Sequence, residues 1–198
     1  AFLDKLYAYT VQANRQGDFR LFSLPHLEAS HTFNPLLGGG PGEIVERVFS
    51  SFKFENEYYR HIQYKVFLML IRLILERKEV PTFILVHRLL TDMTLLGAWA
   101  AESTDELLKY ELLRFMKESP KERAEKISGL EAHLSHFSTG EFAVLFNSTT
   151  PHIQFDQALA EGHICYFQLP SMYLPFLSEA TGKLVLQCFQ NAVSKRHL

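Results

Sequence analysis

Apolar side chains recur at helical spacing through the middle of the chain, and this pattern is the first guide to the fold. Between residues 43 and 137 the sequence is almost entirely helical in pattern. Segment 55–79 is apolar around nearly its whole circumference, and it leaves one narrow polar strip: Tyr58, His61, Lys65, Arg72, Glu76 and Glu79. A helix of this kind is surrounded by other helices. We therefore expect 55–79 to be the central helix of a bundle, with Arg72 and Glu76 paired one turn apart.

Start signals predict the neighbouring helices of this block. Segments 42–52 and 80–92 flank the central helix and carry apolar residues at helical spacing. A serine with a glutamate three residues later can form a capping box, and this pattern occurs at Ser103 and again at Ser119. Proline directly after the second serine fits the first helical position. We expect one helix to begin near each serine.

The two ends of the chain have a different pattern, with short apolar runs of strand length. "DFRLFSLP" and "HICYFQLP" each predict a strand that a proline ends, while 2–16 and 177–196 predict helices. "FAVLFN" is expected to be a short extended piece. The predicted fold class is mainly α, a helical bundle inserted into a partial α/β layer that the two chain ends form. Its predicted segments are 1–37, 38–140 and 141–198, the last with strand 163–168 and the closing helix.

Composition and charge narrow the class of protein. The chain has 198 residues, 47% of them hydrophobic, and a formal charge of −2. Such a chain has no global basic field, so contact with nucleic acid would need a local patch. The two cysteines, Cys165 and Cys188, lie in apolar runs and are expected to be buried free thiols. No segment has the apolar length that spans a bilayer, and the chain opens without Met, as if cut from something longer.

The glycine-rich stretch "TFNPLLGGGPGE" (32–43) resembles a phosphate-binding loop but lacks its chemistry. A P-loop needs a lysine for the phosphates and a hydroxyl for Mg²⁺, and neither is present. Pro41 removes one N–H donor, and Glu43 sits where a positive partner is needed. "TGKLV" (181–185) is a second partial match inside a helical pattern. We interpret the stretch as a hinge before a helix, formed by Asn34, Pro35, Gly38, Gly39 and Gly40.

Other candidate sites are weak in the sequence. His133 and His136 lie three residues apart on one helix, as metal ligands can, but only His152 and His163 in other elements could complete the set. No nucleophilic triad has a local signature. The sequence therefore predicts no catalytic, cofactor-binding or metal-binding residue. Basic residues that could contact DNA or a partner are Lys117, Lys121, Arg123 and Lys126, interleaved with glutamates, and Lys195 and Arg196 near the C-terminus.

The order of these signals resembles the TraG/TraD-type coupling proteins of conjugation and type IV secretion. The resemblance is carried by "LYAYTVQANRQGDFRLFSLP", by "FNPL" (33–36) and by "YFQLPSMYLPFLSEATGKLV" (166–185); the helical block matches by character only. It implies an all-α domain with flanking segments of a RecA-like motor. The Walker A loop would lie before residue 1 and the acidic Walker B strand after residue 198. The piece itself would then be no enzyme and would hold no cofactor.

The resemblance also implies a parent protein and its partners. The parent would be a hexameric ATPase that uses ATP and Mg²⁺, is anchored in the inner membrane and delivers a DNA–relaxase substrate to the secretion channel. The all-α domain would face the cytoplasm and receive relaxase, relaxosome accessory proteins or single-stranded DNA. Two alternatives stay open: a free-standing helical adaptor that binds proteins, and, with less support, an enzyme that uses the histidines.

Overall fold

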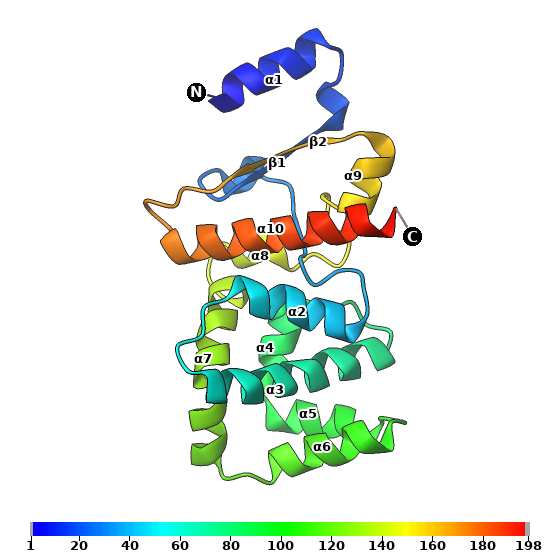
Figure 1. The fold of residues 1–198 in the computed structure, drawn as a ribbon, viewed down its shortest axis with the longest axis vertical. Coiled ribbons are helices and arrows are strands. Elements are labelled where there is room, and N and C mark those ends of the chain that lie inside the picture. Colours follow the sequence, from blue (N-terminus) through cyan, green and yellow to red (C-terminus); the bar gives the residue numbers. More distant parts are fainter. Residues whose placement is uncertain (1, 197–198) are drawn as a thin grey trace. The chain divides into compact units, whose positions relative to one another are not determined.

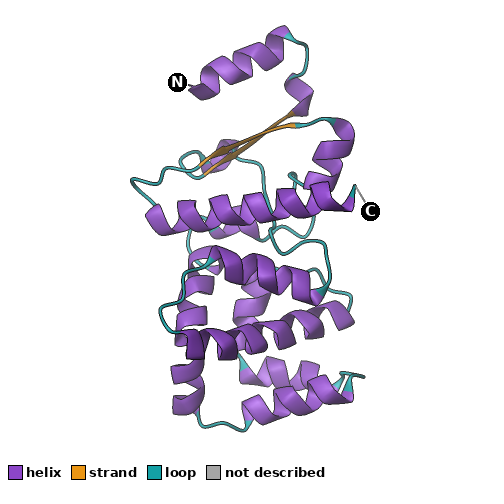
Figure 2. Cartoon of the chain, in the orientation of Figure 1, coloured by secondary structure: helices purple, strands orange, loops and turns teal. Residues whose placement is uncertain are grey.

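The structure of the chain is a computed structural model that describes residues 2–196, and most of these residues are helical (Figures 1 and 2). Contacts between residues divide the chain into two compact units. The first, here called the end unit, comprises Ala1–Pro35 and Val144–Leu198. The second, here called the helical unit, is the continuous segment Leu36–Ala143. The chain therefore leaves the end unit once, forms the helical unit and returns.

A pair of parallel strands joins the two halves of the end unit. Strand β1 (Phe19–Ser23) pairs with β2 (Ile164–Gln168), in a register that sets Phe19 beside Ile164 and Ser23 beside Gln168. The helices of this unit are α1 (Phe2–Gln12), the short α8 (Ala143–Phe146) at its boundary, α9 (Phe155–Glu161) and α10 (Pro175–Lys195), with single 3-10 turns at Gln16–Asp18 and Leu27–Ala29. The predicted pairing of one α/β layer from both chain ends is present as this two-stranded sheet; the RecA-like character of the layer stays a prediction.

Aromatic side chains form the core on one face of this sheet. Phe22 of β1 is fully buried, and its ring centroid lies 5.3 Å from that of Phe146, 5.4 Å from that of Phe167 and 6.3 Å from that of Phe33. Helix α1 covers the other face, where Tyr7 meets Phe19 edge-on at 5.4 Å. Helix α10 lies on the side of the sheet away from α1 (Figure 1). Burial on both faces is what a parallel pair requires.

The helical unit is built around α3 (Glu57–Glu76). The other helices of the unit are α2 (Pro41–Ser51), α4 (Phe83–Thr91), α5 (Met93–Ala101), α6 (Glu106–Met116) and α7 (Pro120–Ser138). Helix α3 contacts α2, α4, α6 and α7, and its Leu70, Leu73 and Ile74 are fully buried. The expectation of a central helix with an apolar circumference is confirmed.

Of the two predicted capping boxes, only the second forms. Ser119 accepts the N–H of Glu122, whose carboxylate accepts the N–H of Ser119, and Pro120 fills the first helical position. The prediction for Ser103 was wrong, because Asp105 caps α6 by accepting the N–H of Leu108. The aspartate displaces the serine because its carboxylate also pairs with an arginine, which a serine hydroxyl cannot do.

That arginine is Arg72, and its predicted pairing with Glu76 was also wrong. Arg72 donates to Asp105, while Glu76 accepts hydrogen bonds from Ser103 and Thr104 in the connection between α5 and α6. Through these contacts, α3 holds the connection between α5 and α6 in place. The contacts prevail because a pair one turn apart on a helix surface contributes only about 0.2–0.5 kcal/mol.

Three local expectations need correction at the ends of the chain. Helix α1 ends at Gln12, short of the predicted 2–16, because Asn14 takes a left-handed backbone with φ 54°. "FAVLFN" contains helix α8 and no strand. Neither cysteine is in a disulfide bond, as expected, but both are only half-buried. Burial raises the pKa of the Cys165 thiol, which disfavours the nucleophilic thiolate.

We expect Glu76→Gln to destabilise the protein at pH 7 and progressively less in acid. Hydrogen bonds from the Ser103 hydroxyl and then from Thr104 lower the pKa of Glu76 from 4.5 to about 2. A carboxyl with a lowered pKa contributes stability above its unfolded pKa, and this contribution is lost as the pH falls from 4.5 toward 2. Replacing this charged acceptor on a partly exposed side chain by a neutral amide should lower the free energy of unfolding by about 1 kcal/mol.

Urea unfolding at pH 7 and pH 3 measures this difference. Glu79→Gln is the matched control, because Glu79 is an exposed carboxylate three residues further on. An equal loss of stability for the two variants, or a loss for Glu76→Gln that does not shrink in acid, would contradict the prediction.

Candidate functional site

The predicted hinge divides into two parts in the structure. Asn34 and Pro35 are buried in the end unit, where the Asn34 Nδ2 donates to the carbonyl of Ser148 at 3.1 Å. Gly38 and Gly39 follow with left-handed backbones, at φ 75° and 91°. The Asn-Pro pair is thus held by its own unit, and the hinge role of these residues stays a prediction.

The glycine segment is tied to helix α2 by two side chains. Arg47 is only 3% exposed, and its guanidinium donates to the carbonyls of Leu37 and Gly38 at 3.1 Å each. Glu43 accepts the N–H of Gly40 at 3.2 Å. This carboxylate occupies the helix N-terminus where an anion would bind. The geometry agrees with the sequence argument against a phosphate site.

The basic residues predicted to contact DNA or a partner lie in different surroundings. Lys117 and Lys121 are exposed on the helical unit. Arg123 donates to the carbonyls of Met116 and Glu118, and Lys126 pairs with the Glu118 carboxylate at 2.6 Å. These two cations are therefore engaged within the chain. The last two predicted contacts belong to the end unit, where Lys195 is exposed and Arg196 donates to the carbonyl of Leu159; residues 197–198 of the same basic tail lie outside the described residues.

The histidines have separate partners. His133 contacts the carbonyl of Lys53 at 2.8 Å, and His152 contacts the hydroxyl of Thr32 at 2.8 Å. His136, three residues after His133, is exposed. Across residues 2–196 no group of three or more His, Cys, Asp or Glu side chains could hold a metal ion.

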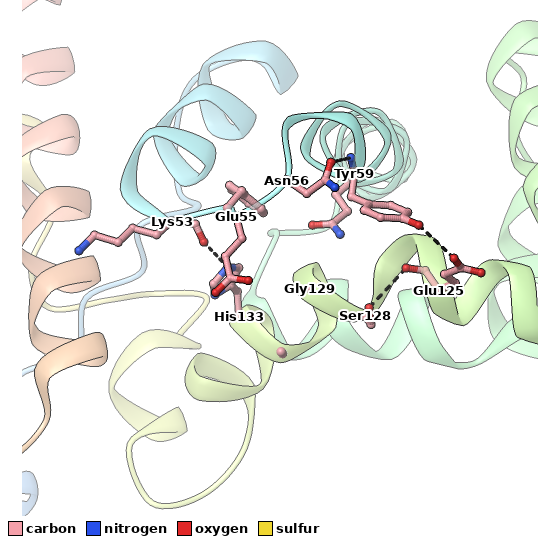
Figure 3. Close-up of a pocket in the computed structure, with 11 residues that line it drawn as sticks. Lys53, Glu55, Asn56, Tyr59, Glu125, Ser128, Gly129 and His133 are labelled. Carbon is pink, nitrogen blue, oxygen red and sulfur yellow. Dashed lines mark hydrogen bonds between the residues drawn. The ribbon is translucent and has the colours of Figure 1, made fainter.

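A cleft in the helical unit brings several polar groups together. Its volume is about 470 Å³ (Figure 3). One wall is the α2–α3 connection together with the start of α3, and the other wall is α7. We call it the Gln63 cleft, and its lining is Lys53, Phe54, Glu55, Asn56, Tyr59, Gln63, Glu125, Ser128, Gly129, Ala132 and His133. Of these residues only His133 was considered from the sequence, as a metal ligand without a complete set, and none was predicted as part of a site.

Gln63 supplies the buried polar group of this cleft. Its side chain is 3% exposed, and its Nε2 donates to the carbonyl of Lys126 at 3.0 Å. That bond fixes the orientation of the amide, because only the nitrogen can donate to a carbonyl. The Oε1 of the same amide is buried and has no hydrogen-bond partner in the structure.

Aromatic rings and two carboxylates border the cleft. The hydroxyl of Tyr59 donates to Glu125 at 3.0 Å, and this bond raises the pKa of the tyrosine. The ring of His133 lies 5.1 Å from that of Phe54. Burial lowers the pKa of His133, so its ring is neutral at pH 7, with the Nε2 hydrogen donated to the carbonyl of Lys53.

The charges around the cleft favour a cation as its occupant. Glu55 and Glu125 place two carboxylates on it, and Figure 3 shows the ammonium group of Lys53 pointing away. The N-terminus of α3 offers little to an anion, because Asn56 already accepts the N–H groups of Tyr58 and Tyr59. The arrangement provides acceptors, aromatic surface and negative charge.

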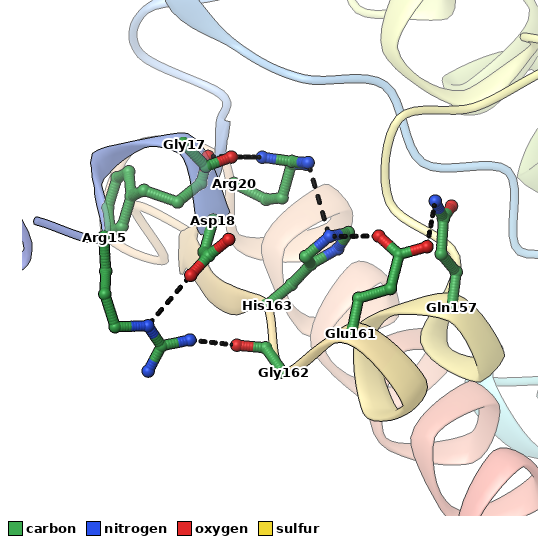
Figure 4. A network of polar contacts seen from close by, with 9 residues as sticks. Arg15, Gly17, Asp18, Arg20, Gln157, Glu161, Gly162 and His163 are labelled. Carbon is green, nitrogen blue, oxygen red and sulfur yellow. Dashed lines mark hydrogen bonds and ion pairs between the residues drawn. The ribbon is translucent and has the colours of Figure 1, made fainter.

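A second polar network holds the end unit together, and its Gly17 and Arg20 also line an open hollow of about 690 Å³ beside α1. Arg15 donates to the carboxylate of Asp18 at 2.9 Å and to the carbonyl of Gly162, which links the turn before β1 to the turn before β2 (Figure 4). His163 Nε2 lies 2.9 Å from Glu161 and 3.4 Å from Arg20. Arginine only donates, so one ring nitrogen cannot serve both neighbours. The shorter contact assigns its hydrogen to Glu161.

Comparison with protein-family models, with curated proteins and with solved structures finds no match to this chain. Among the described residues, no single helix is long and apolar enough to cross a membrane. Helices α4 and α5 reach that length and composition only when taken together, and they are bent by 98° at the break between them.

We expect Gly38→Ala to destabilise the protein by about 1–2 kcal/mol, because alanine is strained in a left-handed backbone. A Cβ at this position meets open space, so the effect would come from the backbone alone. Gly42 of α2 is the control, since its Cβ would also be free and its backbone is helical. Gly42→Ala is expected to stabilise by about 0.5–1 kcal/mol. Urea unfolding of both variants checks the opposite signs, and equal effects would disprove the strain.

Proposed function

We propose that this chain is the substrate-recognition and relaxosome-recognition domain of a DNA-translocating coupling ATPase in type IV secretion or conjugation. One observation supports the proposal most. The two chain ends build a single unit around the parallel pair β1–β2, and the helical unit is one continuous segment between them in sequence. An all-α domain inserted into the α/β layer of a motor has this organisation.

The size of the sheet also supports this proposal. Parallel strands occur almost only in larger sheets with helices on both faces. A two-stranded parallel sheet with an aromatic core on one face and α1 on the other fits one segment of such a layer. In the proposed parent, a homo-hexamer with ATP and Mg²⁺ at sites outside this segment, the remaining strands would extend the layer.

The helical unit would act in the cytoplasm as the receiving surface of an inner-membrane-anchored protein. Its partners would be relaxase, relaxosome accessory proteins and channel components, with single-stranded DNA as a further ligand. The segment itself would have no catalytic role. The Gln63 cleft, whose lining has two carboxylates and one buried acceptor, suits a protein partner better than the DNA backbone, since phosphates would be repelled.

A free-standing adaptor for proteins is the second candidate, and one observation favours it. Helix α6 exposes Leu107, Tyr110 and Leu113, which are 63%, 62% and 41% accessible and lie three residues apart on one face. Leu107 and Tyr110 line a shallow groove of about 330 Å³ between α3, α6 and α7. Such an apolar stripe can dock a helix of a partner.

Affinity purification of the tagged chain from cells that carry the complete transfer system tests the proposal. We expect relaxase and relaxosome accessory proteins to be recovered, and recovery that survives nuclease treatment would indicate protein recognition. Recovery of other proteins without any relaxosome component would overturn the proposal and favour an adaptor. The coding sequence on either side of the segment is an independent check, because the proposal requires a Walker A motif before it and an acidic strand after it.

A gel-shift titration with single-stranded DNA at two salt concentrations measures direct DNA binding. If Lys117 and Lys121 each contact one phosphate, affinity will fall with salt, and the double variant Lys117→Gln/Lys121→Gln will reduce the salt slope by about 1.4. Absence of any shift at low salt would exclude DNA as a direct ligand and leave protein recognition in place.

A further inference from the structure

We propose that the Gln63 cleft binds the guanidinium group of an arginine in a partner protein. The inference rests on the proposed role of the helical unit as a recognition surface, and it names the chemistry that this surface reads. The buried, unpaired oxygen of Gln63, the close approach of its amide to Gly129 and the negative charge of Glu125 support it together.

The first step is the unpaired oxygen of Gln63. The amide is held by its bond to the carbonyl of Lys126, so it cannot rotate to satisfy Oε1 without losing that bond. Buried acceptors nearly always have a partner. An acceptor that lines a cleft and has none is positioned to receive a hydrogen bond from a ligand.

The second step is the glycine that faces this amide. Gly129 lies in the middle of α7, where glycine is less stable than alanine. A Cβ added there would lie 3.1 Å from Nε2 and 3.3 Å from Oε1 of Gln63. These separations are shorter than ordinary contacts, so alanine would press against the amide and displace it. Glycine at this position lets the amide of Gln63 pack directly against α7 at the wall of the cleft.

The third step concerns the charge of the ligand that the cleft can accommodate. Glu55 and Glu125 are exposed at the cleft, and the Tyr59 hydroxyl holds Glu125 in place. The donors at the start of α3 are already bonded to Asn56, and the Lys53 ammonium points away (Figure 3). The polar groups of the cleft are thus mainly acceptors, and its net charge is negative. A cation with several N–H groups is complementary to it.

The fourth step separates a guanidinium from other cations. Guanidinium is planar, carries five donors, stacks on aromatic rings and is more weakly hydrated than an ammonium. It can therefore bond a neutral buried amide and a carboxylate at once, with Phe54, Tyr59 and His133 as aromatic walls. A hard metal ion would need more oxygen ligands, and the described residues contain no such cluster.

An NMR titration of the full chain with the peptide acetyl-Gly-Arg-Gly-amide tests the inference. We expect chemical-shift changes at the Gln63 side-chain amide and at the backbone amides of Ser128 and Gly129. The citrulline peptide has the same shape without the charge, and its binding should be about tenfold weaker. Glu125→Gln should weaken binding of the arginine peptide about threefold, as an exposed ion pair does.

Gly129→Ala tests the geometry separately from the charge. We expect it to lower affinity for the arginine peptide about tenfold, by displacing the amide of Gln63, while thermal unfolding shows the variant folded. Gly182→Ala is the matched control, because a Cβ in that helix would lie 3.6 Å from Leu169, an ordinary contact. Its affinity should equal that of the unchanged chain. If Gly129→Ala does not fold, the Glu125→Gln and citrulline comparisons still decide the question.

Equal binding of the arginine and citrulline peptides, or of a lysine peptide, would overturn the inference, as would shifts confined to residues outside the cleft. Such failure leaves the recognition function untouched, because relaxosome proteins could bind elsewhere on the helical unit. Conversely, arginine binding in the cleft without recovery of any relaxosome protein would support the cleft and remove the proposed coupling role. The two outcomes are therefore distinguishable.

Discussion

Parallel pairing of β1 with β2 is the contact on which the rest of the structure depends. The strands come from opposite ends of the chain, and their register sets the buried Phe22 beside Phe167 in an aromatic core. The entropic cost of bringing the two strands together rises slowly with the length of the connection between them. Each doubling of a flexible loop adds only about 0.6 kcal/mol to the free energy of loop closure. A whole helical unit can therefore be inserted between two strands that still find each other.

The same pairing accounts for the polar contacts at the sheet. Arg15 links the turn before β1 to Gly162 before β2, and Ser23 at the end of β1 donates to Gln168 at the end of β2 at 2.8 Å. Both contacts hold the ends of the two strands in one register. On the outer edge of β1, His31 exchanges hydrogen bonds with Leu21, which satisfies the backbone N–H and carbonyl of that residue.

The helical unit uses a different principle, in which a central apolar helix collects its neighbours. Helix α3 buries its apolar circumference against four helices, and its few polar side chains then become points of attachment. Arg72 and Glu76 fix the connection before α6, and Gln63 reaches α7. The unpaired oxygen of Gln63 is a consequence of this arrangement. The nitrogen of its side-chain amide bonds to α7, whereas the oxygen of the same amide has no partner at the cleft.

The sequence by itself determined the helical character of the middle segment, the two strands, the central helix and the capping box at Ser119, because these depend on periodicity and on residues within one turn. Only the tertiary structure decided the partners of Arg72 and Glu76, the cap at Asp105 and the Gln63 cleft. Gln63 and Gly129 lie 66 positions apart, and no motif links them. Periodicity reports which face of a helix is apolar, whereas hydrogen-bond partners depend on which other helix packs there. A glycine inside the predicted helix after Ser119 was the one local signal of the cleft, and its meaning requires the amide that faces it.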